Sequence, residues 1–134
     1  MKNYLLHVNY WKESAKRDYQ TMLGLFRIKR YSDSLFYGHI VLEKILKALV
    51  VKKTKEIAPR AHDLNALAEA AGLKISKEDA EFLKIVTRFN IKTRYPDFKL
   101  SFYKSCDLNY TKNNLARIKM FYSTLCQKVK SKKS

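Results

Sequence analysis

The sequence has few of the residues that interrupt helices, with only three glycines and two prolines among its 134 residues. Glycine and proline are needed for the many turns between short strands, so their scarcity argues against a β-protein. The chain is instead rich in lysine, leucine and alanine, which favour helices. We therefore expect an all-α fold, and the length fits one domain.

Cysteine is also scarce, and the two present, Cys106 and Cys126, have neither the spacing of a metal site nor the number needed for a disulfide framework. Cys126 falls on an apolar helical stripe, which predicts a small buried side chain. The three histidines are scattered, and there is no glycine-rich phosphate loop or nucleophile beside an evident base. The sequence therefore predicts no metal site and no cofactor.

Long apolar runs are missing as well. No stretch approaches the roughly 18 apolar residues of a membrane-spanning helix, and the apolar run in residues 1–8 is too short for a signal peptide. These absences predict a cytoplasmic protein.

Acidic residues are outnumbered, with 12 against 28 Lys and Arg, which gives a net charge of +16. Such an excess favours an anionic partner, which leaves nucleic acid, a nucleotide, an acidic protein or an anionic membrane surface. The charge is spread over the chain, with a modest concentration in a tail that we expect to be solvated and disordered. Charge alone does not choose among these partners.

Apolar periodicity predicts an up-and-down bundle of four main helices and one short helix. Side chains that can cap the helices mark several of their starts. The four main helices are expected at residues 9–29, 34–53, 76–93 and 111–129 and the short one at 64–71, with caps from Ser32 or Asp33, Asp63, Ser76 and Gly72. Residues 95–110 are expected to be irregular. The regular stripe of the last helix, Leu115, Ile118, Tyr122, Leu125 and Val129, can complete the core or meet a partner chain.

The second helix is apolar around most of its circumference, which predicts a central position. A polar row crosses it, because His39, Glu43 and Lys47 recur every four residues, and Glu43 before Lys47 is the order that favours an ion pair. Asp18 on the first helix needs a partner and can join this row. Gly38 predicts the close approach of a neighbouring backbone.

A cluster of functional side chains stands where the fourth main helix must stop at Pro96. Arg94, Tyr95 and Asp97 lie at this helix exit, and Arg88 lies on the last turns. Guanidinium groups and a phenol can hold a phosphate or stack on a base. Arginines near a helix C-terminus are also ordinary partners of the helix dipole, which is the simpler alternative.

Five pieces of the sequence, taken in their order and spacing, carry a likeness to a known family. They are Tyr10-Trp-Lys-Glu-Ser-Ala-Lys-Arg-Asp18, Arg30-Tyr-Ser-Asp-Ser-Leu-Phe-Tyr-Gly-His39, Leu42-Glu-Lys-Ile-Leu-Lys-Ala48, His62-Asp-Leu-Asn-Ala-Leu67 and Arg94-Tyr-Pro-Asp97. Together they resemble a HEPN domain (higher eukaryotes and prokaryotes nucleotide-binding). The resemblance places this domain at residues 9–129, between an extension at 1–8 and a basic tail at 130–134.

The resemblance implies a compact helical bundle, often a homodimer, that is commonly paired with a minimal nucleotidyltransferase as a toxin–antitoxin system. Toxin members look like metal-independent ribonucleases, with an arginine followed a few residues later by a histidine. Arg88 matches that arginine, but Thr93, Arg94 or Tyr95 occupies the histidine's place. Histidine is the side chain that exchanges protons near neutral pH, whereas tyrosine titrates near about 10. The catalytic motif is therefore incomplete, and anion binding by Arg88 and Arg94 remains.

The other histidines and lysines have competing interpretations. His39 is expected to be structural, whereas His62 can orient its loop or contact a ligand near Arg94. Lys44 and Lys47 can reach a phosphate, but a pair of Lys47 with Glu43 or Asp18 is the simpler expectation.

Three functions follow from these residues. The first is a module that binds a nucleotide or RNA beside a nucleotidyltransferase, with Asp97 fixing Arg94 and with Tyr95 as an alternative site of adenylylation, as the resemblance implies. The second is a ribonuclease with an unusual set drawn from Arg88, Arg94, Tyr95 and His62. The third is a non-catalytic dimeric interaction protein whose charge serves only solubility.

Overall fold

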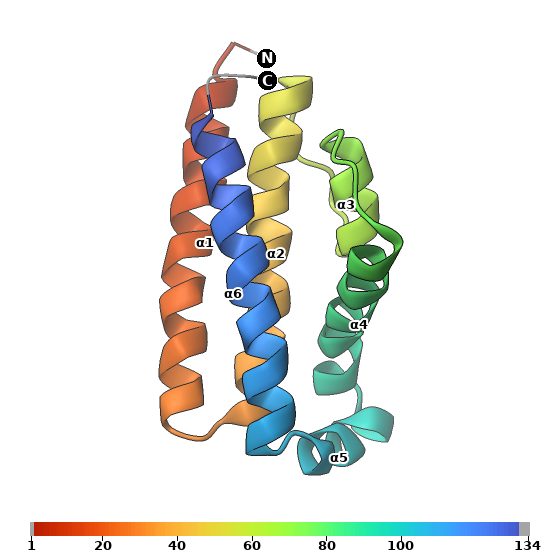
Figure 1. Cartoon of the computed structure of the whole chain (residues 1–134). Coiled ribbons are helices and arrows are strands. Elements are labelled where there is room, and N and C mark those ends of the chain that lie inside the picture. The colour runs from red at the N-terminus through yellow and green to blue at the C-terminus, as the bar shows by residue number, and fades with distance from the viewer. Residues whose placement is uncertain (1, 132–134) are drawn as a thin grey trace.

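The computed structural model describes residues 2–131, apart from the side chain of Pro96, and it is built from helices (Figure 1). Within these residues the helices are α1 (Tyr4–Arg27), α2 (Tyr31–Thr54), α3 (Leu64–Ala70), α4 (Lys77–Arg94), α5 (Pro96–Ser105) and α6 (Leu108–Lys130), without a strand. The all-α prediction is confirmed. None of the helices in this part of the chain combines the length and apolar character needed to cross a membrane. The last three residues of the predicted tail lie outside the described residues.

α2 is the centre of the bundle and contacts every other helix. α1 and α6 lie on one side of it and α3 and α4 on the other, while α5 crosses the end opposite the start of α1 and the end of α6 (Figure 1). Successive side chains of α2, including Leu42, Ile45 and Leu46, are buried. The central position predicted from its apolar circumference is therefore correct, and its few polar residues must find partners inside the bundle.

α6 completes the core. Its stripe residues Leu115, Ile118, Leu125 and Val129 are buried within the single chain, so the alternative that this stripe meets a partner chain is wrong. α6 also approaches α2 closely at Gly38, where an added Cβ atom would lie 2.6 Å from the Cδ1 atom of Ile118. The close neighbour of Gly38 is thus a side chain and not the backbone that we expected.

Helix starts depart from the prediction where packing extends a helix. α1 begins at Tyr4 instead of residue 9, and buried Val8 lies in the added turn. α2 begins at Tyr31 with Arg30 in the cap position, so neither Ser32 nor Asp33 caps it. Asp33 instead pairs with Arg30 at 2.7 Å.

The caps predicted at α3 and α4 are present. The side chain of Asp63 accepts hydrogen bonds from the backbone N–H groups of Asn65 and Ala66 at the start of α3. Gly72 follows α3 with a φ of 73°, a left-handed conformation that suits glycine. Ser76 accepts from the backbone N–H of Asp79 at the start of α4.

The prediction of irregular structure at residues 95–110 is wrong, because α5 and the first turn of α6 occupy most of it. Pro96 occupies the first turn of α5, where its fixed φ suits a helix and its missing N–H costs nothing. Phe102 of α5 is buried, with its ring centroid 5.5 Å from that of Phe89 on α4. This contact holds α5 across the end of α4.

Cys126 on α6 is half-buried, whereas the sequence predicted a buried side chain.

Candidate functional site

Glu43 is the centre of the polar row on α2. The Nζ atom of Lys47 donates to its Oε2 atom at 3.0 Å, and the Nδ1 atom of His62 lies 2.8 Å from its Oε1 atom. The Glu43 side chain is only 12% exposed and that of Lys47 only 8%. Burial raises the pKa of Glu43, but the hydrogen bonds from His62 and Lys47 outweigh this effect and hold the pKa below its ordinary value. The carboxylate is therefore charged and partnered on both oxygens.

His39 lies beside this carboxylate and is fully buried. Its Nε2 atom lies 2.8 Å from the backbone carbonyl oxygen of His62, to which it donates, while Nδ1 has no hydrogen-bond partner among the described residues. Burial lowers the pKa of His39 and outweighs the hydrogen bond to the His62 carbonyl and the charge of Glu43, which raise it, while the charge of Arg94 adds a smaller lowering. A neutral buried imidazole that ties down a loop is in the position of a structural histidine.

Asp18 lies outside this row. Its Oδ2 atom is 2.6 Å from the Nζ atom of Lys44, which also donates to the Ser14 hydroxyl at 2.7 Å. The expected pairing of Asp18 with Lys47 is therefore not formed, because the rotation of α1 against α2 aims Asp18 at Lys44. The Lys47 ammonium group instead lies 5.1 Å from the ring centre of Trp11. Lys44 and Lys47 are each paired with a carboxylate, so neither is a free cation for a phosphate.

His62 is the exposed member of the cluster, and its side chain is 60% accessible to solvent. His39 donates to the backbone carbonyl of His62, and Glu43 holds the His62 ring. Two residues further on, the backbone N–H of Leu64 donates to the Thr87 hydroxyl on α4 at 3.2 Å. A carboxylate can only accept, so Nδ1 of His62 carries the proton in this contact. When the ring is neutral, Nε2 is then the atom left to accept a proton or a hydrogen bond.

Arg94 stands at the last position of α4 and is exposed. Its guanidinium carbon lies 5.5 Å from the ring centre of Phe36 on α2, and its charge acts on His39. The expected pair with Asp97 is not among the ion pairs of the described residues. The chain turns at Tyr95, with φ −102° and ψ 129°, so Asp97 belongs to the first turn of α5 and Arg94 to α4.

The remaining predicted residues border this corner without joining the cluster. Tyr95 and Asp97 are exposed at the junction of α4 and α5, and Arg88 is exposed on α4. Six residues of an α-helix separate Arg88 from Arg94, which corresponds to about 9 Å along the axis and a rotation of about 120°. No hydrogen bond or ion pair links the two arginines to each other or to a carboxylate in the described part of the chain. We call Arg88, Arg94, Tyr95 and Asp97 the α4–α5 corner.

Phe36 and Trp11 are the neighbours that the sequence did not reveal. Both are apolar residues of long helices, for which helical periodicity alone predicts packing in the core. The available signal was helical spacing, because Phe36 lies seven residues before Glu43 on the same stripe of α2. That spacing predicts an aromatic ring in line with the polar row.

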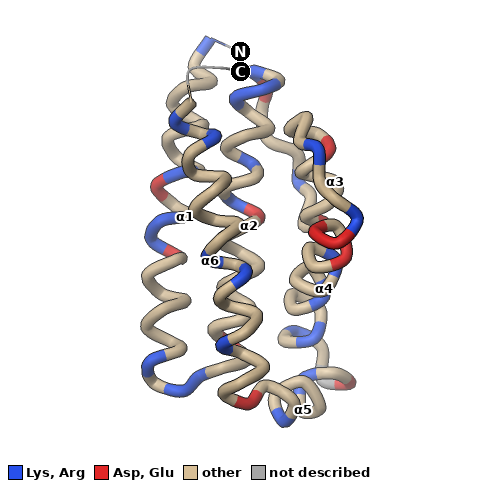
Figure 2. Tube along the Cα trace, viewed as in Figure 1, with Lys and Arg blue, Asp and Glu red and all other residues tan. Residues whose placement is uncertain are grey.

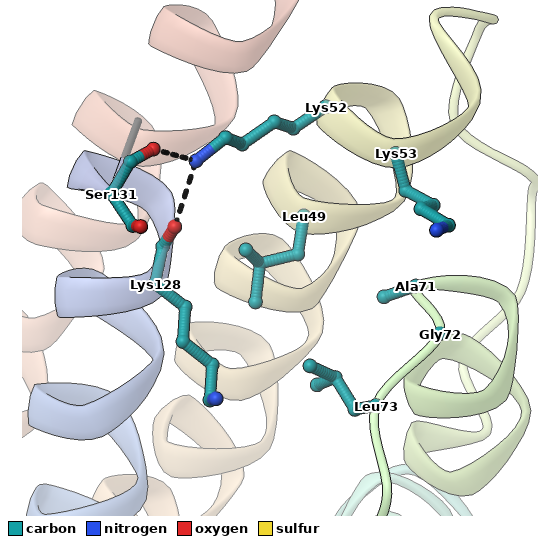
Figure 3. Close-up of a pocket in the computed structure, with 8 residues that line it drawn as sticks. All are labelled: Leu49, Lys52, Lys53, Ala71, Gly72, Leu73, Lys128 and Ser131. Atoms are coloured by element: carbon teal, nitrogen blue, oxygen red, sulfur yellow. Dashed lines mark hydrogen bonds between the residues drawn. The ribbon is translucent and has the colours of Figure 1, made fainter. Parts of the chain in front are cut away.

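A separate hollow at the other end of the bundle, near the end of α6, holds none of the predicted site residues (Figure 3). The Nζ atom of Lys52 donates there to the backbone carbonyls of Lys128 at 2.9 Å and Val129 at 3.1 Å, and also to that of Ser131. Lysine commonly binds the carbonyls left open at a helix end. The Lys52 contacts in this hollow therefore attach the end of α6 to α2.

Comparison with known proteins gives one positive finding. The family model of the HEPN domain matches residues 8–130, which is nearly the whole chain. Neither the search of curated proteins nor the search of solved structures found a match. The helical bundle formed by the described residues agrees with the helical architecture that the resemblance implied. The chain therefore belongs to the HEPN domain family and is a helical module of a nucleotide- and RNA-related kind.

Proposed function

We propose that this HEPN protein binds the phosphates of a nucleotide or RNA at the α4–α5 corner and works beside a minimal nucleotidyltransferase in a toxin–antitoxin-type system. The observation that carries the binding site is Arg94. Its guanidinium group is exposed and has no carboxylate partner among the described residues, yet it is held over the Phe36 ring. A cation that is oriented but not neutralised is available to an anion.

The chemistry of the corner suits phosphate. A guanidinium group offers a planar set of donors that matches two phosphate oxygens. Arg88 adds a second cation further along α4, and the exposed phenol of Tyr95 adds a hydroxyl and an aromatic face. His62, on the loop before α3, and Arg94 both act electrostatically on His39. Figure 2 shows that Lys and Arg are spread over the long helices, so the field of the whole chain attracts anions and the local geometry of the corner must select the place where they bind.

The pairing with a nucleotidyltransferase rests on the family likeness, together with the exposure of Tyr95. In such a pairing the Tyr95 phenol oxygen would attack the α-phosphate of a nucleoside triphosphate, lose its proton and release pyrophosphate. A homodimer follows from the same likeness and stays a prediction, which light scattering after size-exclusion chromatography would test.

One observation favours a second candidate function, a metal-independent ribonuclease. The contact with Glu43 leaves Nε2 of His62 exposed and able to accept a proton when the ring is neutral. Cleavage also needs an acid for the leaving oxygen, and His39 cannot supply it because it is buried. Binding is therefore the function that this geometry supports better.

The test is binding of a fluorescently labelled single-stranded RNA, followed by anisotropy over a range of salt concentrations. The Arg88→Ala, Arg94→Ala double variant should bind more weakly, and its salt dependence should fall by about one unit of slope for each lost phosphate contact. An Arg17→Ala, Arg27→Ala variant removes the same charge from exposed positions on α1 and serves as the control. Equal losses in both double variants would contradict a specific site.

The same preparations distinguish binding from cleavage. Incubation of total RNA with the wild-type protein in EDTA should leave the RNA intact. Cleavage by the wild type but not by the Arg88→Ala, Arg94→Ala variant would instead establish the ribonuclease. A rise in melting temperature with ATP concentration would identify a nucleotide as a ligand.

A further inference from the structure

An apolar hollow lies where α1 begins and where the loop after α2 passes it. The hollow has a volume of about 540 Å³ and is lined by Leu6, His7, Tyr10, Trp11, Ile57 and Ala58. Three of the large side chains are unusually open to solvent, with Leu6 69%, Tyr10 61% and Ile57 71% exposed. Single exposed apolar residues are common, but a group of them around a hollow marks a binding surface.

The make-up of the lining indicates a small aromatic group as the occupant. Pockets for such groups have volumes of roughly 300–1,000 Å³ and are mostly apolar, with a few polar groups that fix orientation. Here the imidazole of His7 and the hydroxyl of Tyr10 provide the polar groups. The rings of Tyr10 and Trp11 stand edge to face with centroids 5.1 Å apart, which gives the hollow aromatic walls.

The hollow is physically continuous with the polar row. The Lys47 ammonium group lies over the Trp11 ring and donates to Glu43, and Glu43 holds His62. Phe36, beneath Arg94, lies on the same stripe of α2, eleven residues before Lys47, which corresponds to about 16 Å along the helix. The hollow and Arg94 therefore mark two ends of one line along α2, with His62 between them.

We propose that this hollow binds a base of a single-stranded nucleic acid whose phosphates pass His62 and reach Arg94. This inference rests on the proposed function, because it extends the phosphate site to a second contact with the same ligand. Charge favours this occupant, since the strand that bears the base has an anionic phosphate backbone and the protein has a net charge of +16. Stacking on aromatic side chains is how proteins hold single-stranded bases without pairing.

Trp11 is the only tryptophan of the chain, so its fluorescence reports directly on the hollow. The probe is a single-stranded RNA of six adenosines, and the comparison ligand is pyrophosphate, which has the anionic groups but no base. The RNA should quench Trp11 in a saturable titration, whereas pyrophosphate should leave it unchanged. Quenching by both ligands to the same extent would overturn the proposal, because a base would then not be needed.

Affinity measurements on variants give the second readout. Tyr10→Ala should weaken binding of the labelled RNA by about tenfold, which is the loss of one stacked base. Ile57→Ala should weaken it by less, because an aliphatic side chain packs against a base without stacking on it. Leu5→Ala is the matched control, because Leu5 is an exposed residue of the same helix that does not line the hollow. Tyr10 and Ile57 are exposed, so their replacement leaves the core intact, and circular dichroism verifies this.

The outcomes separate this proposal from the function on which it rests. If Trp11 is unchanged at saturating RNA and Tyr10→Ala binds like Leu5→Ala, the hollow is not a base site. The phosphate site nevertheless stands if Arg88→Ala, Arg94→Ala weakens binding in the same assay. Quenching at undiminished affinity in the arginine variant would instead support the hollow and overturn the phosphate site. No binding by the wild-type protein would overturn both.

Discussion

Two charged regions meet at His39, and they differ in how their charges are satisfied. In the polar row, the Glu43 carboxylate is enclosed and receives hydrogen bonds from Lys47 and His62. At the α4–α5 corner, the Arg94 guanidinium group is exposed and lies on an aromatic ring, without a carboxylate among the described residues. Sequence spacing treats both as polar residues on helices. Burial and partners are what separate a charge that holds the fold from a charge that is free to bind.

The energetic consequence of a substitution should differ in the same way. A buried ion pair whose partner is removed leaves an uncompensated charge, which is strongly destabilising. An exposed arginine can be replaced at little cost to stability, because water solvates what remains. Stability measurements should therefore respond to the polar row, and binding measurements to the corner.

The largest effect is expected from Glu43→Gln. This variant keeps the shape of the side chain but leaves the buried Lys47 ammonium group without its carboxylate, so the free energy of unfolding should fall by about 3 kcal/mol. Chemical denaturation measures this loss. Glu69→Gln, an exposed residue of α3, is the control and should change the value by less than about 0.5 kcal/mol. An equal loss of unfolding free energy in the two variants would show that the buried ion pair stabilises the fold no more than an exposed charge does.

The next effect is a loss of stability in mild acid. The ordinary pKa of His39 is 6.5, and its pKa in the folded protein is lower. Between these values the unfolded chain binds more protons, so the free energy of unfolding should decrease as the pH falls below about 6.5. Glu43, whose pKa is below its ordinary value of 4.5, adds a second loss at lower pH.

His39→Gln should remove the first of these two losses and retain the second. Denaturation curves between pH 7 and pH 4 measure the effect, and His7→Gln is the control because His7, at the start of α1, is only half-buried. A slope between pH 6.5 and 5 that is unchanged in His39→Gln would assign the acid sensitivity to another group.

A smaller effect is expected when Arg94 is replaced by lysine. The charge is preserved, but the planar contact with the Phe36 ring is lost, which is worth about 0.5–1 kcal/mol at an exposed site. RNA affinity should therefore fall by about two- to fivefold, while the salt dependence stays the same. Phe36→Leu should reproduce this loss with Arg94 intact. A full loss of binding in either variant would mean that the ring does more than orient the guanidinium group.

The smallest effect is expected from Asp97→Asn. Asp97 and Arg94 belong to different helices and form no ion pair, so RNA affinity should change by less than about twofold. A small gain is the expected direction, because a negative charge is removed near the phosphate. A large loss in the same anisotropy assay would show that Asp97 fixes Arg94 once the ligand is bound.

The long helices were predictable because their apolar residues follow the helical period. α5 was not, since Pro96 is read as the end of one helix and is equally suited to be the first residue of the next. Only the packing of Phe102 against Phe89 decides between these two meanings. Local sequence patterns therefore predict the long helices, but they do not predict how the chain turns at the α4–α5 corner.

The site was predictable only as a set of residue types. The order of Glu43 and Lys47 indicated their ion pair, because both lie on one helix. The partner of Asp18 and the ring beneath Arg94 depend on how α1 and α4 are rotated against α2. Such rotations are set by the whole core and leave no mark in the spacing of the two residues concerned.

The two ends of the proposed ligand path lie at opposite ends of the bundle, so a bulky group attached at one end can test the path. α1 begins at the end of the bundle opposite α5, and α6 ends beside it (Figure 1). The hollow around Tyr10 lies near the start of α1, whereas Arg94 lies close to α5. A bulky domain fused to the N-terminus therefore crowds one end of the path and leaves the other open. Mononucleotides and long strands should then respond differently to the same fusion.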